Sequence, residues 1–215
     1  AEQWADAKEE ELNAYKRDEN YRREFIGNVS HELKTPIFNI QGYIQTLLDG
    51  GLKDDNINLK YLERTNKSVD RMINIVEDLE VISRLETDEY QLDLQTFNIF
   101  ELASEVIDAF EMKASQMNIT LELINESQTE LVIGDKDKIQ QVLMNLVSNS
   151  IKYGKDGGKT RVRFFDMEAN MLIEIADDGI GIAEDSLDRL FERFYRVDKN
   201  RSRDIGGTGL GLAIV

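Results

Sequence analysis

One histidine, His31, stands in a sequence without cysteine, and it is the side chain best suited to nucleophilic chemistry. A neutral imidazole, with a pKa of about 6.5, can act as a nucleophile at pH 7. On a helix, His31 and Thr35 would face the same way because they lie four residues apart. Pro36 has no N–H to bond the carbonyl of Glu32. A lone histidine is more often an exposed residue without a role, so the surrounding sequence has to decide.

A second polar group lies in the segment 141–153. Asn145 and Asn149, four residues apart, would share one face of a helix with Lys152. Two amides and an ammonium group suit a magnesium–triphosphate, because Mg²⁺ keeps its waters and binds mainly phosphate oxygens. The buried face of this helix is expected to consist of Ile139, Val142, Leu143, Leu146 and Ile151. A solvated helix face explains the polar residues equally well, so this segment alone does not decide.

Asp177 follows a run of strand-forming residues and precedes Gly179 and Gly181. A carboxylate at a strand end can accept a hydrogen bond from the amino group of adenine, whereas guanine offers a carbonyl there. The glycines would let the backbone pass close to a base. An Asp-Gly pair after a strand is more often only a turn, so this motif is weak alone.

A glycine-rich segment, 206–212, leads into the start of a helix, where several N–H groups and a positive dipole end suit phosphate. It is neither a Walker loop nor a dinucleotide fingerprint, because no Gly-Lys-Ser/Thr follows and the glycines are two apart. Basic residues are frequent between the two glycine motifs, among them Arg193, Arg196, Lys199, Arg201 and Arg203. In so acidic a chain, one or more of them is expected to contact phosphate.

Composition excludes several functions. The 215 residues include 26 Lys and Arg against 42 Asp and Glu, a net charge of −16. This balance disfavours binding to nucleic acid or to anionic lipid. Without cysteine and with one histidine, disulfide scaffolds and thiolate or His-rich zinc sites are excluded. No apolar run approaches the roughly 20 residues that span a bilayer. Because the chain starts at Ala1, we expect a piece of a longer protein.

The first part of the chain predicts two long helices. Residues 1–48 are charged and helical in pattern, residues 49–55 form a glycine-containing turn, and an apolar stripe then runs from Leu62 to Leu79. Such an antiparallel hairpin cannot cover its own stripe on both sides. A second copy would complete a four-helix bundle, so we expect a dimer.

After Leu85 the pattern changes to alternating helices and strands. Asp135 is the expected N-cap of a helix that runs to about Tyr153. The other predicted elements are strands at 97–99, 119–124 and 131–133, a helix at 101–117, and a hairpin of strands 160–166 and 171–177 around residues 168–170. This part is therefore α/β with mainly antiparallel strands.

Taken together, the motifs resemble the catalytic core of a sensor histidine kinase of two-component systems. Five motifs match in order and spacing over residues 25–215: the phosphoacceptor box at His31, the N box at 145–153, a first glycine box at 177–181, the F box at 191–194, and a second glycine box at 207–211. One such motif could arise by chance, but the ordered set is specific.

The resemblance implies a fold and a division into domains. The fold class would be α+β, a dimeric helical hairpin followed by an α/β-sandwich ATP-binding domain of the gyrase/Hsp90 type. Residues 1–90 would be the dimerisation and histidine phosphotransfer helices, with 1–24 as an incoming linker helix. Residues 91–215 would be the ATP-binding domain, incomplete at its C-terminus because the family continues into a further strand. Asp178 departs from the family, which commonly has Asn there, and would add charge near the nucleotide.

The resemblance also implies a role for each motif residue. His31 would attack the γ-phosphate of ATP, with Glu32 as base or hydrogen-bond partner. Thr35 would help to position a water that hydrolyses a partner's phosphoaspartate. Asn149, assisted by Asn145, would hold Mg²⁺. The remaining nucleotide contacts would be Lys152 and Tyr153, the adenine-binding Asp177 with Gly179 and Gly181, the phosphate-binding Arg196, and the lid residues Gly207, Thr208, Gly209, Leu210 and Gly211.

The function implied is therefore autophosphorylation of His31 and transfer of the phosphoryl group to an aspartate of a response regulator receiver domain, with phosphatase activity. The cofactors would be ATP and Mg²⁺, and the other partner a second copy of the chain. These domains are expected in the cytoplasm without membrane contact of their own. Membrane attachment of the whole protein stays open, because what precedes Ala1 is not seen.

Two other classes of protein compete with this interpretation. An ATPase of the gyrase, Hsp90 or mismatch-repair type shares the nucleotide motifs but has no phosphoacceptor hairpin, so the His31 segment argues against it. A dimeric scaffold with a dead nucleotide site would be expected to lack His31, Asn149 or Asp177, and all three are present.

Overall fold

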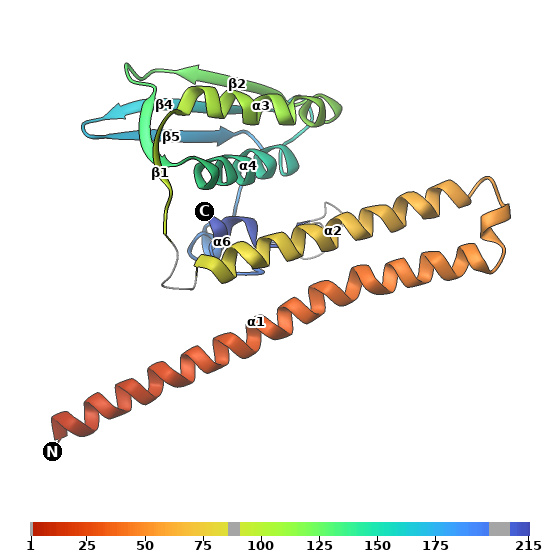
Figure 1. Ribbon diagram of the computed structural model, residues 1–215, viewed down its shortest axis with the longest axis horizontal. Helices are drawn as coiled ribbons and strands as arrows, with labels where there is room; N and C mark the ends of the chain where they lie inside the picture. The colour runs from red at the N-terminus through yellow and green to blue at the C-terminus, as the bar shows by residue number, and fades with distance from the viewer. Residues whose placement is uncertain (1, 86–90, 198–206) are drawn as a thin grey trace. The chain divides into compact units, whose positions relative to one another are not determined.

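The computed structural model describes residues 2–85, 91–197 and 207–215 (Figure 1). The chain divides into two compact units, residues 1–80 and 81–215. The first unit is built from two long helices, and the second is an α/β domain. The α+β fold expected from the sequence is thereby confirmed.

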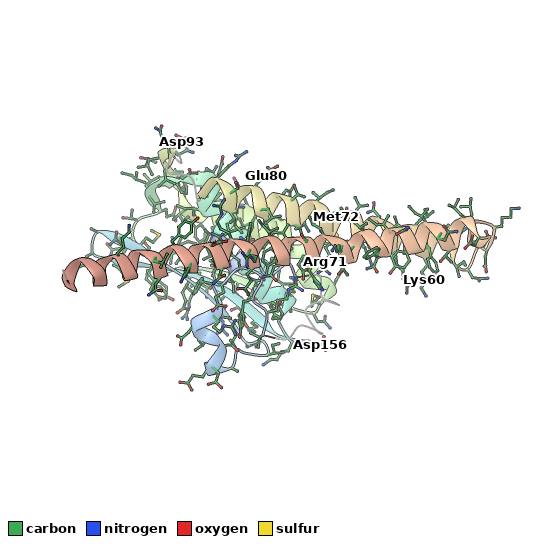
Figure 2. All side chains as sticks on the ribbon, turned by 90° about the horizontal axis from the view of Figure 1, so that it is seen from below. Lys60, Arg71, Met72, Glu80, Asp93 and Asp156 are labelled. Carbon is green, nitrogen blue, oxygen red and sulfur yellow. The ribbon has the colours of Figure 1, made fainter. Side chains whose placement is uncertain are left out.

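The helical unit is a hairpin of α1, Glu2–Leu48, and α2, Asn58–Leu85. Helix α1 continues through Pro36. The aromatic rings of Tyr43 and Tyr61 pack edge to face with their centroids 5.5 Å apart, and so join the two helices near the turn. Figure 2 marks Lys60, Arg71, Met72 and Glu80 along α2. In the part of the chain that the structure describes, no helix is both long and apolar enough to cross a membrane.

The turn between the helices depends on two glycines. Gly50 has a φ of +117°, a left-handed conformation that other residues rarely adopt, and it precedes the short 3₁₀ helix η1, Gly51–Lys53. Gly51 is buried so close to α1 that a Cβ atom would lie 2.7 Å from the carbonyl oxygen of Thr46. The chain can therefore reverse direction tightly here only with glycine at these positions.

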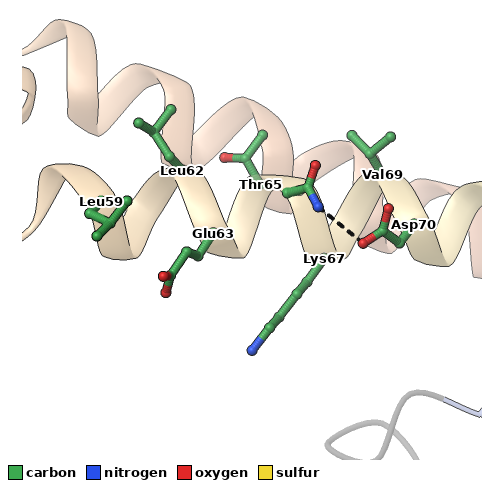
Figure 3. Close-up of a pocket in the computed structure, with 8 residues that line it drawn as sticks. Leu59, Leu62, Glu63, Thr65, Lys67, Val69 and Asp70 are labelled. Carbon is green, nitrogen blue, oxygen red and sulfur yellow. Dashed lines mark hydrogen bonds between the residues drawn. The ribbon is translucent and has the colours of Figure 1, made fainter.

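Helix α2 leaves an open groove along its surface. The groove has a volume of about 830 Å³. It is lined by both apolar and polar side chains (Figure 3): Leu59, Leu62, Glu63, Thr65, Asn66, Lys67, Val69 and Asp70. Leu59 is 63% exposed and Leu62 is 50% exposed, so the apolar stripe predicted for this helix is not covered by α1 over this stretch.

The second unit begins with a small two-stranded sheet and the first of its two long helices. Strand β1, Leu94–Asn98, leads into α3, Ile99–Gln116, and pairs antiparallel with β3, Leu131–Asp135. Asn98 caps α3 because its side chain accepts hydrogen bonds from the N–H groups of Phe100 and Glu101. The strand predicted at 97–99 is therefore misplaced at its end: Ile99 is the first residue of the helix.

The main sheet has three strands in the order β2–β4–β5. Strands β4, Lys159–Met167, and β5, Asn170–Asp177, form the predicted antiparallel hairpin, joined by only two residues. Strand β2, Thr120–Asn125, pairs parallel with β4, with Leu123 opposite Val162. Two of the three strand pairings in the described residues are thus antiparallel, which agrees with the mainly antiparallel sheet that the sequence predicts. The third, between β2 and β4, is parallel.

Helix α4, Lys136–Lys152, lies with α3 on one face of the main sheet (Figure 1). Its N-cap is Asp135, whose carboxylate accepts a hydrogen bond from the N–H of Lys138, and its C-cap is Tyr153. Both ends therefore confirm the sequence prediction. Its predicted buried face needs correction: Leu143 and Ile151 are buried, but the third buried apolar residue is Val147, while Ile139, Val142 and Leu146 are half-buried.

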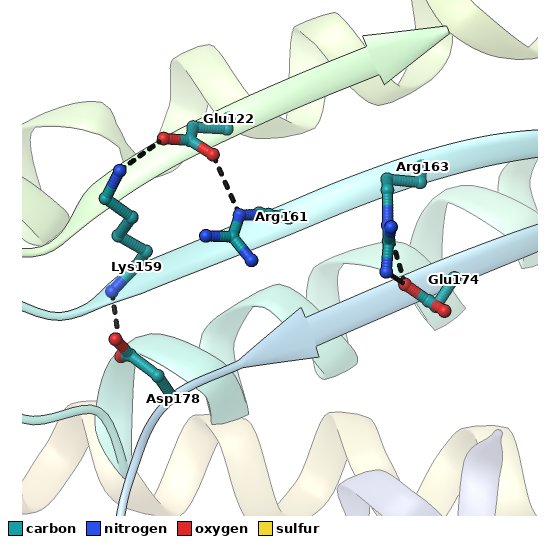
Figure 4. A network of polar contacts seen from close by, with 6 residues as sticks. All are labelled: Glu122, Lys159, Arg161, Arg163, Glu174 and Asp178. Carbon is teal, nitrogen blue, oxygen red and sulfur yellow. Dashed lines mark hydrogen bonds and ion pairs between the residues drawn. The ribbon is translucent and has the colours of Figure 1, made fainter. Parts of the chain in front are cut away.

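Strand β4 alternates between the core and the outer face of the sheet. Thr160, Val162 and Phe164 are buried, and the Thr160 hydroxyl donates to the Ser150 hydroxyl of α4 at 3.0 Å. The outer face carries ion pairs (Figure 4): Glu122 with Lys159 and Arg161, and Glu174 with Arg163. One face of the sheet is thus solvated, as is common for sheets with antiparallel strands.

In the part of the chain after β5 that the structure describes lie the 3₁₀ helix η2, Glu184–Arg189, and the helical turn α6, Gly211–Ile214. Three of the basic residues singled out in the sequence, Lys199, Arg201 and Arg203, lie outside the described residues.

Candidate functional site

His31 lies on α1 with its side chain 63% exposed to solvent. The hydroxyl of Thr35, one turn later, donates to the carbonyl oxygen of His31 at 3.4 Å, a long hydrogen bond that can be broken at little cost. The imidazole is therefore open to an incoming group. The predicted pairing of His31 and Thr35 on one helix face is present in the structure.

The carboxylate of Glu32 is held beside this imidazole. Its Oε1 lies 4.0 Å from Nδ1 of His31, and its Oε2 accepts a hydrogen bond of 2.9 Å from Nη2 of Arg71 on α2. The side chains of Glu32 and Arg71 are only 14% and 17% exposed. Arg71 was missed by the sequence reasoning, because it lies 39 residues away and belongs to no motif.

Helix α4 contributes four of the predicted nucleotide contacts. Asn145, Asn149, Lys152 and Tyr153 are all half-buried, so they do not form a fully solvated helix face. The Nζ of Lys152 lies 5.9 Å from the centre of the Tyr153 ring. Amide oxygens, an ammonium group and an aromatic ring are thus presented together along the end of one helix.

The turn after β5 is joined to the end of α4. The N–H of Gly179 donates to Oδ1 of Asp177 at 2.9 Å, and the N–H of Ile180 donates to the carbonyl oxygen of Tyr153 at 3.1 Å. A Cβ atom on Gly179 would lie 2.4 Å from that same carbonyl oxygen. Glycine is therefore required for the Asp177 turn to approach α4 this closely, whereas Gly181 has open space and a φ of +70°.

The side chain of Asp178 is directed toward the start of β4 and the loop before it, away from the contact between the Asp177 turn and α4. Its Oδ1 accepts a hydrogen bond of 2.9 Å from the N–H of Lys159, and its Oδ2 lies 3.6 Å from Nζ of Lys155. The hydrogen bond from Lys159, aided by the charge of Lys155, lowers the pKa of Asp178 below its ordinary value. The negative charge that the sequence places near the nucleotide, on Asp178, is therefore bound by the start of β4 and by the loop before it.

The second glycine motif lies against α4. The amide nitrogen of Asn145 donates to the carbonyl oxygen of Gly211 at 3.1 Å, and a Cβ atom on Gly207 would lie 3.0 Å from Nζ of Lys152. The hydroxyl of Thr208 accepts a hydrogen bond from the N–H of Leu210. Leu210 is fully buried, so among the predicted contacts it can serve a ligand only through its backbone.

The F box and the residues just after it are joined to this second glycine motif by hydrogen bonds. The N–H of Phe194 donates to the carbonyl oxygen of Gly209 at 2.7 Å, and Nη2 of Arg196 donates to that of Thr208 at 2.9 Å. Phe194 has a φ of +63°, a strained conformation for an aromatic residue. The structure thus brings Arg196 to the same loop as the predicted phosphate-binding glycines.

These residues suit a magnesium nucleotide better than a bare metal ion. Within the described residues no three His, Cys, Asp or Glu side chains come together as a metal site. Mg²⁺ binds well when phosphate oxygens supply part of its shell, with one or two protein oxygens such as those of Asn145 and Asn149. The chemistry of the donors therefore fits Mg²⁺ that arrives with ATP.

Comparisons with known proteins match both units. The family described as histidine kinase-, DNA gyrase B-, and HSP90-like ATPase matches residues 134–215, and the His Kinase A (phospho-acceptor) domain matches residues 21–88. The sensor histidine kinase WalK of Bacillus subtilis is 39% identical over 198 residues, which are 90% of this chain and 32% of the relative. The chain thus spans about a third of the length of this relative.

Solved structures of histidine kinases are also similar to this chain. Histidine kinase AdeS of Acinetobacter baumannii is 32% identical with a TM-score of 0.69, over 86% of this chain and 83% of that one. Histidine kinase ThkA, solved in complex with response regulator protein TrrA, is 28% identical with a TM-score of 0.68, over 86% of this chain and 56% of that one. With a phospho-acceptor domain followed by an ATP-binding domain, the chain belongs to the sensor histidine kinase family.

Proposed function

We propose that this chain catalyses ATP-dependent phosphorylation of His31 and transfers the phosphoryl group to an aspartate of a response regulator. The observation that carries the proposal is an exposed imidazole beside a fixed carboxylate, in a chain that also has an ATP-binding domain. We assign residues 1–90 to the phosphoacceptor hairpin and 91–215 to the nucleotide-binding domain. Because ATP is an intracellular substrate, the reaction would take place in the cytoplasm.

The first step would be attack by the imidazole on the γ-phosphorus of ATP. Nδ1 of His31 is the ring nitrogen nearer to Glu32, which leaves Nε2 as the nucleophile. The new N–P bond forms as the bond from phosphorus to the β,γ-bridging oxygen breaks, and ADP leaves with the electron pair. The proton on Nδ1 passes to Glu32. Such transfer depends on positioning and on neutralising phosphate charge more than on covalent catalysis.

The nucleotide-binding domain would supply that positioning and charge. Asp177 would accept a hydrogen bond from the amino group of adenine, with Gly179 and Gly181 shaping the pocket. Asn149 and Asn145 would contribute oxygens to Mg²⁺. Contacts to the phosphates would come from Lys152, Tyr153, Arg196, and the backbone of Gly207, Thr208, Gly209, Leu210 and Gly211. The hydrogen bonds of Asn145 and Arg196 to the second glycine motif support this assignment.

The partners would be a second copy of the chain and a receiver domain. The exposed apolar stripe of α2 supports the dimer. The complex of the similar kinase ThkA with TrrA supports the receiver. Phosphatase activity would use Thr35 to orient a water toward the phosphoaspartate; its long hydrogen bond to the His31 carbonyl leaves the hydroxyl free to do so.

Labelling with γ-phosphate-labelled ATP and Mg²⁺ tests the first step. We expect acid-labile, alkali-stable label on the wild type and none on His31→Gln. Asn149→Ala should also remain unlabelled, whereas Thr35→Ala should be labelled but defective in dephosphorylating the receiver. ATP hydrolysis without label on His31 would favour an ATPase, and absence of both binding and label would favour a scaffold.

A further inference from the structure

The closeness of His31 and Glu32 needs an explanation. Consecutive residues of a helix point in directions about 100° apart and do not normally face each other. Here Nδ1 of His31 nevertheless lies only 4.0 Å from Oε1 of Glu32. The other oxygen, Oε2, is bound by Nη2 of Arg71 from the opposite helix at 2.9 Å. The guanidinium therefore holds one oxygen of the carboxylate while the other stays beside the ring.

This ion pair differs from the mobile pairs of a protein surface. The side chains of Glu32 and Arg71 are 14% and 17% exposed, whereas the surface pair Arg23–Glu19 on α1 is 76% and 56% exposed. The Nε of Arg71 is buried, and no hydrogen-bond partner for it exists among the described residues. Loss of the carboxylate would leave the charge poorly compensated, so the pair has a strong reason to stay formed.

We propose that Arg71 is a positioning residue for the phosphorylation of His31, acting through Glu32; this inference rests on the proposed function. By occupying Oε2, Arg71 presents Oε1 to Nδ1, which favours the tautomer with its proton on Nδ1 and leaves the lone pair on Nε2 for the γ-phosphate. The proton that Glu32 receives from Nδ1 then passes to water, and the carboxylate is restored for the next transfer.

The tautomer can be measured directly, because the chain has only one histidine. We would label histidine with ¹⁵N in protein purified without a histidine tag. Long-range ¹H–¹⁵N spectra would be recorded at about pH 8.5, where an imidazole is neutral. The expected result is an excess of the Nδ1–H tautomer in the wild type. Arg71→Met should lose that excess and Arg71→Lys should recover part of it. Lys60→Met is the matched control, removing an exposed cation from the same helix, and should keep the wild-type spectrum.

A double-variant cycle tests whether Arg71 acts through Glu32. In a Glu32→Gln background, Arg71→Met should change the tautomer no further, because the carboxylate is already gone. This double variant also removes both charges together, so it guards against loss of folding caused by a lone buried guanidinium. A tautomer ratio unaffected by Arg71→Met, or an equal effect in both backgrounds, would overturn the proposal.

Kinetics supply a second readout. Misplacing a base by about 1 Å can cost about 10²-fold in rate. Arg71→Met should therefore lower kcat for labelling of His31 by that order and leave KM for ATP unchanged; a raised KM with normal kcat would contradict the proposal. Because the tautomer is measured without ATP, the two hypotheses separate. If Arg71 controls the tautomer but His31 takes up no label, the proposed function fails although the coupling of Arg71 to the ring stands. If His31 is labelled but Arg71 does not control the tautomer, this inference alone fails.

Discussion

Asp178 shows how one carboxylate can join the ends of two strands. It accepts a hydrogen bond from the N–H of Lys159 at the start of β4, and its own N–H donates to the Lys159 carbonyl oxygen at 3.3 Å. The family resemblance leads one to expect Asn at this position. Asn keeps an oxygen that can accept from Lys159 but loses the charge that attracts Lys155.

We therefore predict that Asp178→Asn destabilises the chain slightly and Asp178→Ala clearly more. The pKa of Asp178 is lowered in the folded chain, so its contribution to stability is present above the unfolded pKa of about 3.9. That contribution fades as the pH falls through the lower folded value. Urea unfolding of the wild type and Asp178→Asn from pH 7 to pH 3 checks this. A stability difference that stays constant over that range would contradict it.

At this scale the sequence predicted the motif residues but not their partners. Asn145, Lys152 and Asp177 could be proposed as site residues because their motifs are local in sequence. Arg71 could not be found, because its pairing with Glu32 depends on how the two helices are aligned across the turn. The direction of the Asp178 side chain was also unpredictable, because it depends on the backbone of a strand that starts 19 residues earlier.

Among the elements, the contact between the F box and the second glycine motif depends on Gly209. This residue has a φ of +76°, and a Cβ atom would lie 2.9 Å from the carbonyl carbon of Phe194. Gly157 has a similar φ of +71° but open space around it. A substitution at Gly157 therefore carries only the cost of the left-handed conformation, whereas one at Gly209 also has to displace the F box.

We predict that Gly157→Ala and Gly209→Ala each lose about 1–2 kcal/mol of stability from the left-handed conformation. Only Gly209→Ala must also move the backbone of Phe194, and with it the loop that carries Arg196. Its Kd for a fluorescent ATP analogue should rise about tenfold, equivalent to about 1.4 kcal/mol, while that of Gly157→Ala stays unchanged. Equal affinities in a titration of both variants would show that this loop does not form part of the nucleotide site.

Helix ends and strand pairings differ in how far they can be predicted. The start of helix α4 was predicted because its N-cap, Asp135, acts within three residues of itself. The parallel pairing of β2 with β4 was not predicted, because α4 and β3 intervene and no local signal specifies which strand β2 will join. The strand predicted at 97–99 begins three residues later than β1 and ends one residue too far, since Ile99 suits a strand but follows a helix cap.

On the scale of the whole molecule, an acidic chain leaves apolar surface uncovered. Each copy carries a net charge of −16, so two copies repel each other over distances that salt screens. Yet α2 exposes Leu59, Leu62, Val69, Ile73 and Val76 along its length. Burial of these side chains against a second copy is the expected source of dimer stability, because it outweighs repulsion that falls as salt rises.

Two results should follow if this stripe is the dimer interface. Leu62→Asp places a charge in the groove of α2 and should shift the chain toward monomer in light scattering after size exclusion, whereas Asn74→Asp, on an exposed polar position of the same helix, should leave the dimer intact. Added salt should tighten the wild-type dimer, since screening removes repulsion without weakening apolar contacts. A dimer that weakens with salt would mean instead that ion pairs hold the copies together, and a dimeric Leu62→Asp would place the interface on another face.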